Sequence, residues 1–197
     1  MKQLCCLLLG GVMTLSSLNA GASSYAELAY SRLSIDYKPF PDANGVRALA
    51  QLGIGERIEA YGSYNSAEFR PSGPELGQYA LASDWADLGA RIALLRGETL
   101  RLALGASSQS VELDSDRKYG HALHANLRWT PSARLQLELD LAQMDLVIDD
   151  IRASAALALH LSESLSLTTR IIDHSDWDLT FYEAGLRWNF GAALTAQ

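Results

Sequence analysis

Apolar and polar side chains alternate one by one along most of this chain, and this alternation limits its fold more than any other feature. In residues 134–141, leucines occupy every second position, and the positions between them carry arginine, glutamine, glutamate and aspartate. Residues 151–161 repeat the pattern with isoleucine, alanine and leucine on one face. A period of two residues is that of a β-strand with one apolar and one polar face. The sequence therefore predicts an all-β protein.

The alternation and the turn residues together predict about ten antiparallel strands. They cover residues 25–37, 45–54, 56–66, 86–96, 99–112, 119–129, 134–145, 150–162, 165–173 and 179–190. Eight strands remain possible if two of the short strands are not separate. In the first strand the alternation changes phase between Tyr30 and Leu33, which predicts a β-bulge.

The connections between these strands alternate between tight turns and longer loops. The turns lie at residues 53–56, 96–99, 130–133 and 162–164, and the loops at 38–45, 66–85, 110–118 and 173–178. Bacterial membrane barrels keep short turns on the periplasmic side and longer loops outside. The short connection at 146–150 departs from this rule, because it is predicted to be external.

The first 22 residues have the pattern of a secretory signal peptide. Lys2 gives a positive start, residues 4–15 are almost wholly apolar, and Ala20 and Ala22 fit an A-x-A cleavage site. Cleavage would remove both cysteines, so we expect no disulfide in the mature chain. The predicted organisation is a signal peptide at 1–22, a barrel at 23–190 and a C-terminal tail at 191–197.

After cleavage no apolar run is long enough for a transmembrane helix, so only a closed β-barrel could place this chain in a membrane. We therefore predict an antiparallel up-and-down transmembrane barrel. Its lumen would be lined by the polar face of the strands, with Arg101, Arg128, Glu138, Asp140, Arg152, Arg170, Glu183 and Arg187. The alternation fits one other arrangement, a soluble periplasmic lipocalin-like barrel with the leucine face inward and an apolar ligand inside.

The last strand resembles the closing strand of Gram-negative outer-membrane proteins, which alternates apolar residues, carries a glycine and ends in an aromatic residue. The residues that carry this resemblance are Tyr182, Gly185, Leu186, Trp188 and Phe190. The pattern over residues 23–190 is similar to that of small OmpA-like and Ail-like barrels. The resemblance implies an integral protein of the cell outer membrane, in contact with lipid and lipopolysaccharide, whose closing strand is recognised by the barrel-assembly machinery.

Two short segments carry residues that could do chemistry. His160 and Ser162, followed by a glutamate, have the His-x-Ser spacing of outer-membrane lipid A deacylases. Their predicted position at a periplasmic turn argues against this activity, because lipid A lies in the outer leaflet. His174 lies in an acidic segment, near aspartates of the preceding loop, and resembles the Asp/His pairs of omptin proteases. The segment is better explained as a solvated acidic loop, or as carboxylates that bind a divalent cation near lipopolysaccharide.

The sequence predicts no cofactor and no metal site. Loss of Lys2 with the signal peptide leaves 15 basic and 23 acidic residues, a net charge of −8, which argues against a nucleic-acid partner. We expect a non-enzymatic protein with a structural or narrow-pore role in the envelope. The alternatives are a lipid A-modifying hydrolase and the soluble binding barrel.

Overall fold

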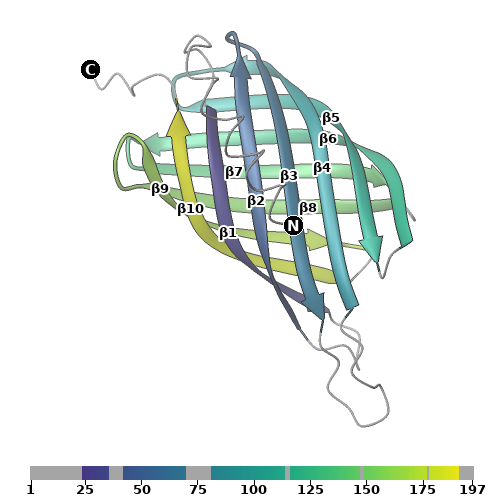
Figure 1. Ribbon diagram of the computed structural model, residues 1–197. Helices are drawn as coiled ribbons and strands as arrows, with labels where there is room; N and C mark the ends of the chain where they lie inside the picture. The colour runs from purple at the N-terminus through teal and green to yellow at the C-terminus, as the bar shows by residue number, and fades with distance from the viewer. Residues whose placement is uncertain are drawn as a thin grey trace.

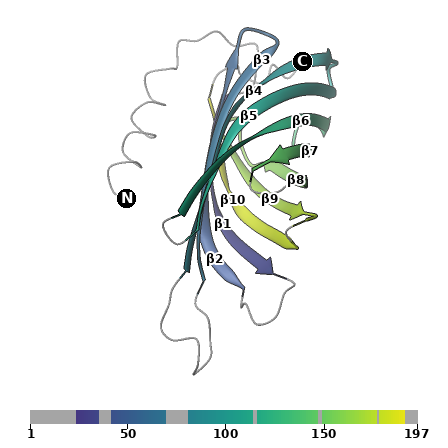
Figure 2. The same ribbon diagram turned by 90° about the vertical axis from the view of Figure 1, so that its right-hand side faces the viewer.

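The computed structural model is a closed barrel of ten antiparallel strands (Figures 1 and 2). It describes residues 24–35, 42–69, 81–113, 116–146, 149–176 and 178–190. The predicted signal peptide and C-terminal tail lie outside the described residues. The strands are β1 (Ser24–Ile35), β2 (Ala43–Ile54), β3 (Ile58–Phe69), β4 (Leu81–Arg96), β5 (Leu100–Leu113), β6 (Asp116–Ser132), β7 (Leu135–Asp145), β8 (Asp149–His160), β9 (Leu165–His174) and β10 (Leu179–Phe190).

Each strand pairs with its neighbours in the sequence, and β10 closes the barrel by pairing with β1 along its whole length, from Ser24 opposite Phe190 to Ile35 opposite Leu179. The predicted all-β, up-and-down barrel is confirmed, and the strand number is ten rather than eight. None of the described residues forms a helix long and apolar enough to cross a membrane.

The structure corrects two local predictions. The predicted loop at 110–118 is mostly strand, because β5 and β6 continue to Leu113 and from Asp116, with Glu112 opposite Arg117. Arg117 Nε donates to Glu112 Oε2 over 2.9 Å, so two charged residues of the predicted loop form a cross-strand pair. The predicted bulge in β1 is also wrong, since its pairing with β10 runs without a shift.

The apparent change of phase in β1 has a simple cause. Tyr25, Glu27, Ala29, Ser31 and Leu33 are all buried, so every odd position faces inward. The inward side chains of β1 are polar near the middle of the barrel and apolar at its external end. An assignment by polarity alone therefore puts Leu33 on the outward face, although it faces the lumen. The irregularities lie elsewhere, between Ala93 and Leu95 in β4 and between Trp129 and Ser132 in β6.

The barrel is inside out compared with a soluble protein. Leucines of the alternating face point outward, and Leu88, Leu123 and Leu141 expose 71%, 64% and 57% of their surface. Arg128, Glu138 and other charged residues are buried in the lumen. This orientation contradicts the lipocalin-like alternative, which requires the leucine face inside. A continuous apolar belt of this kind is suited to lipid rather than water.

Apolar side chains also occupy the external end of the lumen. One cluster joins Leu33, Ala43, Ala67 and Phe181, and a second joins Ala122, Ala142 and Met144. Trp85 of β4 packs against both clusters. The interior therefore has two layers, a charged one and an apolar one nearer the external loops.

Candidate functional site: the charged lumen

Seven arginines and six carboxylates form ion pairs across the lumen, in two groups. The first group, called here the Glu27 cluster, consists of Glu27, Glu183, Arg47, Arg170 and Arg187. Arg187 Nη2 lies 2.8 Å from Glu27 Oε2, and Arg47 Nη1 lies 2.9 Å from Glu183 Oε2. Because β1, β2, β9 and β10 supply these residues, the cluster ties the first two strands of the barrel to the last two.

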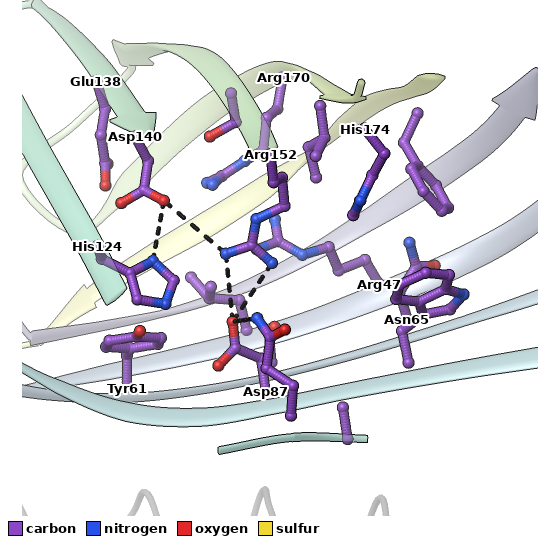
Figure 3. Close-up of a pocket in the computed structure, with 18 of the residues that line it drawn as sticks. Arg47, Tyr61, Asn65, Asp87, His124, Glu138, Asp140, Arg152, Arg170 and His174 are labelled. Carbon is purple, nitrogen blue, oxygen red and sulfur yellow. Dashed lines mark hydrogen bonds and ion pairs between the residues drawn. The ribbon is translucent and has the colours of Figure 1, made fainter. Parts of the chain in front are cut away.

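The second group, called here the Glu138 cluster, is a chain of pairs that crosses the barrel. Its members are Glu59, Asp87, Glu138, Asp140, Arg91, Arg101, Arg128 and Arg152. Arg128 Nη1 lies 3.2 Å from Glu59 Oε1, and Arg152 Nη2 lies 3.4 Å from Asp87 Oδ2. Asp140 and Asp87 both hold Arg152, and Asp140 also contacts His124 Nδ1 at 3.2 Å (Figure 3).

Inward-facing glycines give these long side chains room. A Cβ atom on Gly105 would lie 2.5 Å from Arg91 Cγ, and one on Gly89 would lie 2.7 Å from Cζ of Tyr61. The Arg91 guanidinium in turn lies over the Tyr61 ring, 4.5 Å from its centre. The small residues of one strand thus accept the large side chains of the next, and the lumen fills.

The two clusters leave the lumen close to electrical neutrality. Taking an ionised group out of water costs several kcal/mol, which only close partners of opposite charge offset. The four acids and four arginines of the Glu138 cluster cancel, and the Glu27 cluster retains one positive charge. Such an arrangement ties the strands together across the lumen.

A cavity of about 80 Å³ remains between the Glu138 cluster and the apolar layer (Figure 3). Polar side chains from the surrounding strands line it, among them Asn65, Asp87 and Gln109. Trp85, Phe181 and His174 form an aromatic part of its wall, and the centres of the Trp85 and His174 rings lie 5.3 Å apart.

The structure places all eight predicted lumenal residues inside the barrel, where each makes an ion pair within one of the two clusters. Sequence reasoning missed five partners, which are Glu27, Arg47, Glu59, Asp87 and Arg91. All five alternate with outward-facing residues, so a count of every second position in β1 to β4 could have found them.

His160 and Ser162 make their hydrogen bonds to other residues. His160 Nδ1 lies 2.8 Å from Ser166 Oγ, and Ser162 Oγ accepts a hydrogen bond of 3.1 Å from the backbone N–H of Leu165. Ser162 therefore stabilises the turn between β8 and β9. Both residues lie at the end of the barrel that carries the tight turns.

His174 lies inside the barrel near its external end rather than in a loop. Its Nδ1 atom lies 2.7 Å from Asp150 Oδ2, and both residues are buried. Asp150 also accepts a hydrogen bond from the backbone N–H of Asp176. Among the described residues, no group of three or more histidine, cysteine, aspartate or glutamate side chains could hold a metal ion.

Three of the predicted assembly-signal residues of β10 face outward. Tyr182, Leu186 and Trp188 expose 49%, 39% and 42% of their surface. Gly185 lies opposite Ala29 of β1, and a Cβ atom there would lie 2.3 Å from the Leu28 carbonyl oxygen. Phe190 ends the strand opposite Ser24.

No protein-family model matches this chain, and a comparison with curated proteins found no match. Solved structures do align with it. The KdgM porin in complex with disordered oligogalacturonate shares 12% identity over 82% of this chain and 98% of its own, with a TM-score of 0.51. An outer membrane channel from Pseudomonas putida F1 shares 9% sequence identity, over 88% of this chain and 97% of its own, with a TM-score of 0.54. The β domain of the Bordetella autotransporter BrkA shares 10% sequence identity, over 85% of this chain and 99% of its own, with a TM-score of 0.52.

At these identities the alignments describe the fold and not a shared activity. The predicted resemblance to small outer-membrane barrels is confirmed at this level. The charged lumen and the apolar outer belt agree with it. This chain therefore has the fold of an outer-membrane β-barrel.

Proposed function

We propose that this protein is an integral outer-membrane barrel with a structural, non-conducting role in the envelope. The observation that carries the proposal is the pair of ion-pair clusters across the lumen. Arg187, Gln51 and Glu59 are fully buried there, and each makes a polar contact with a neighbouring strand. A ten-strand barrel is narrow, so side chains of this length fill most of its cross-section.

The free-energy cost of separating the ion pairs supports a lumen that stays closed. Moving one partner aside to admit an ion would leave the other charge buried and unpaired, at a cost of about 3–5 kcal/mol. Glu59 and Glu138 each hold two arginines, so several pairs would break together. The lumen is therefore expected to stay closed without a large rearrangement.

Conductance across planar lipid bilayers tests this proposal. We expect no steady single-channel current from the unmodified protein. The double variant Arg91→Ala/Glu138→Ala should conduct, because it removes two large side chains from the lumen. The neighbouring charges keep their partners, since Asp140 still pairs with Arg152 and Arg128 still pairs with Glu59. The control Glu112→Ala/Arg117→Ala removes an exposed pair outside the lumen and should stay silent. A steady current from the unmodified protein would instead establish a narrow pore.

The outer membrane is the proposed location, reached through the cleaved signal peptide. The outward leucines support lipid and lipopolysaccharide as the surroundings of the barrel, and the exposed aromatic residues of β10 support recognition by the barrel-assembly machinery. The proposal expects the protein in the detergent-extracted outer-membrane fraction, with an electrophoretic mobility that shifts on boiling. Recovery from the soluble periplasm would contradict it.

The absence of an enzymatic role is also part of the proposal. The hydrogen bonds of His160 to Ser166 and of Ser162 to Leu165 support it, because neither side chain is placed to activate the other. Mass spectrometry of lipid A is the test. A strain lacking the gene should have unchanged lipid A, and altered acylation that His160→Ala or His174→Ala reproduces would establish the hydrolase instead.

A further inference from the structure

We propose that the cavity in the external half of the lumen binds a small, neutral, polyhydroxylated molecule, such as a polyol or a single sugar ring. The cavity lies on the external side of the Glu138 cluster, so the proposal holds whether or not the barrel conducts. It rests on the size of the cavity, the hydrogen-bonding character of its wall, its charge balance and its aromatic side.

The size of the cavity sets the size of the ligand. A buried water molecule needs about 10–15 Å³ of such space, so 80 Å³ accommodates about five to eight water-sized groups. This number matches a polyol or part of a sugar ring. Trp85 and Ile172 line the cavity on the side of the apolar layer, and both are only partly buried.

Residues that line the cavity carry buried polar atoms without hydrogen-bond partners, among them the donors Arg91 Nε and Arg170 Nε. The side-chain oxygens of Asn65 and Gln109 accept no hydrogen bond from the described residues, although the two residues are only 8% and 5% exposed. Each of these amides donates one N–H group, to Ser31 Oγ and to Asp87 Oδ2 respectively, both at 3.4 Å. The second oxygen of Asp87, Oδ1, also lacks a partner. A ligand that satisfies these three oxygens must donate hydrogen bonds.

His174 also lines the cavity, and its Nδ1 atom lies 2.7 Å from Asp150 Oδ2, which holds the ring in place. The three oxygens of Asn65, Asp87 and Gln109 come from β3, β4 and β5. A set of three acceptors from different strands is suited to several hydroxyl groups of one molecule.

The charges of the wall select a neutral ligand. Four arginines and three carboxylates line the cavity, so its wall has no net negative charge to attract a cation; they are Arg47, Arg91, Arg152, Arg170, Asp87, Glu138 and Asp140. Each of these arginines is already paired with carboxylates, so an anion would have to compete with Glu183, Glu138 and Asp87. On the external side, Trp85 and Phe181 offer an apolar surface that suits the C–H face of a sugar or polyol.

Ligand titration of the folded protein, in a detergent without a sugar headgroup, tests this inference. Saturation-transfer NMR would follow erythritol and glucose as neutral probes, and glucuronate and glucosamine as charged analogues. We expect saturable millimolar binding of a neutral probe and binding of both charged analogues that is weaker by about tenfold or more. Asn65→Ala and Gln109→Ala should each weaken binding by about tenfold, because each removes one acceptor.

Gln136→Ala is the matched control. Gln136 faces the lumen at the opposite end, next to Ala158, and does not line the cavity, so its removal should leave the affinity unchanged. Retention of the heat-dependent mobility shift shows that each variant folds. If an alanine variant fails to fold, Ser63→Leu fills the cavity and should abolish binding.

Three results would overturn the inference. The first is no saturable binding of either neutral probe. The second is tighter binding of glucuronate or glucosamine than of glucose. The third is an affinity that Asn65→Ala, Gln109→Ala and Ser63→Leu all leave unchanged.

Discussion

Replacing Leu139 with arginine tests whether lipid covers the outward face of the barrel. Leu139 exposes 51% of its surface and lies opposite Ala155, near the centre of the outward apolar positions at 151–161. Leu161, which directly follows β8, is 58% exposed and serves as the comparison. The two leucines have similar exposure but would lie at different depths in a membrane.

The structure gives the expected magnitude. Ala155 and Leu161 are six residues apart, about 20 Å along a strand and about 14 Å along the membrane normal at a tilt of about 45°. Leu139 then lies near the midplane of a hydrocarbon core about 25–30 Å thick, and Leu161 lies at its edge. Arginine costs about 2–4 kcal/mol at the midplane and about 0–1 kcal/mol at the interface.

Urea unfolding of both variants in phospholipid vesicles measures these costs. Leu139→Arg should lower the free energy of unfolding by about 2–3 kcal/mol more than Leu161→Arg does. In water, substitution of either exposed leucine would change stability by less than about 0.5 kcal/mol. Equal effects of the two substitutions, both this small, would refute the conclusion that the leucine face contacts lipid.

Three further predictions concern the lumen and the external rim. Glu138→Ala leaves Arg91 short of its closest carboxylate, and should lower the free energy of unfolding by about 3–5 kcal/mol; a loss below 1 kcal/mol in urea titrations would show that the pair is not buried in solution. Gly105→Val places side-chain atoms where Arg91 passes, so it should reduce the yield of folded, heat-modifiable barrel, whereas Gly55→Asn, in a turn with positive φ and open space, should not. At the rim, hydrogen bonding from Arg32 holds the pKa of Asp42 below its usual value of about 3.9. The Arg32–Asp42 pair therefore stabilises the fold above a pH of about 3.9, and this stabilisation is lost as the pH falls through the lowered pKa of Asp42. In an NMR titration of the Asp42 carboxyl, Arg32→Ala should restore the ordinary pKa. An unchanged pKa of Asp42 would contradict the contact.

The sequence by itself determined the class of the fold, because the signals involved are local. A strand has a period of two, and a tight turn needs particular residues, so the alternation at 134–141 and 151–161 fixed strands that the structure places within a few residues. The same locality explains the errors. Residues 110–118 were predicted as a loop, because the pairing of Glu112 with Arg117 across a hairpin depends on the register of two strands and is not a local signal.

Only the tertiary structure decided which face is inside and which charges meet. Alternation is unchanged when the two faces are exchanged, so the sequence left open whether leucines or arginines fill the barrel. The partner of Glu27 could not be read from the sequence either, because Arg187 follows it by 160 residues and reaches it only when β10 pairs with β1. The cavity beside Asn65 and Gln109 likewise exists only where side chains of several strands converge, and closure of the barrel sets that geometry.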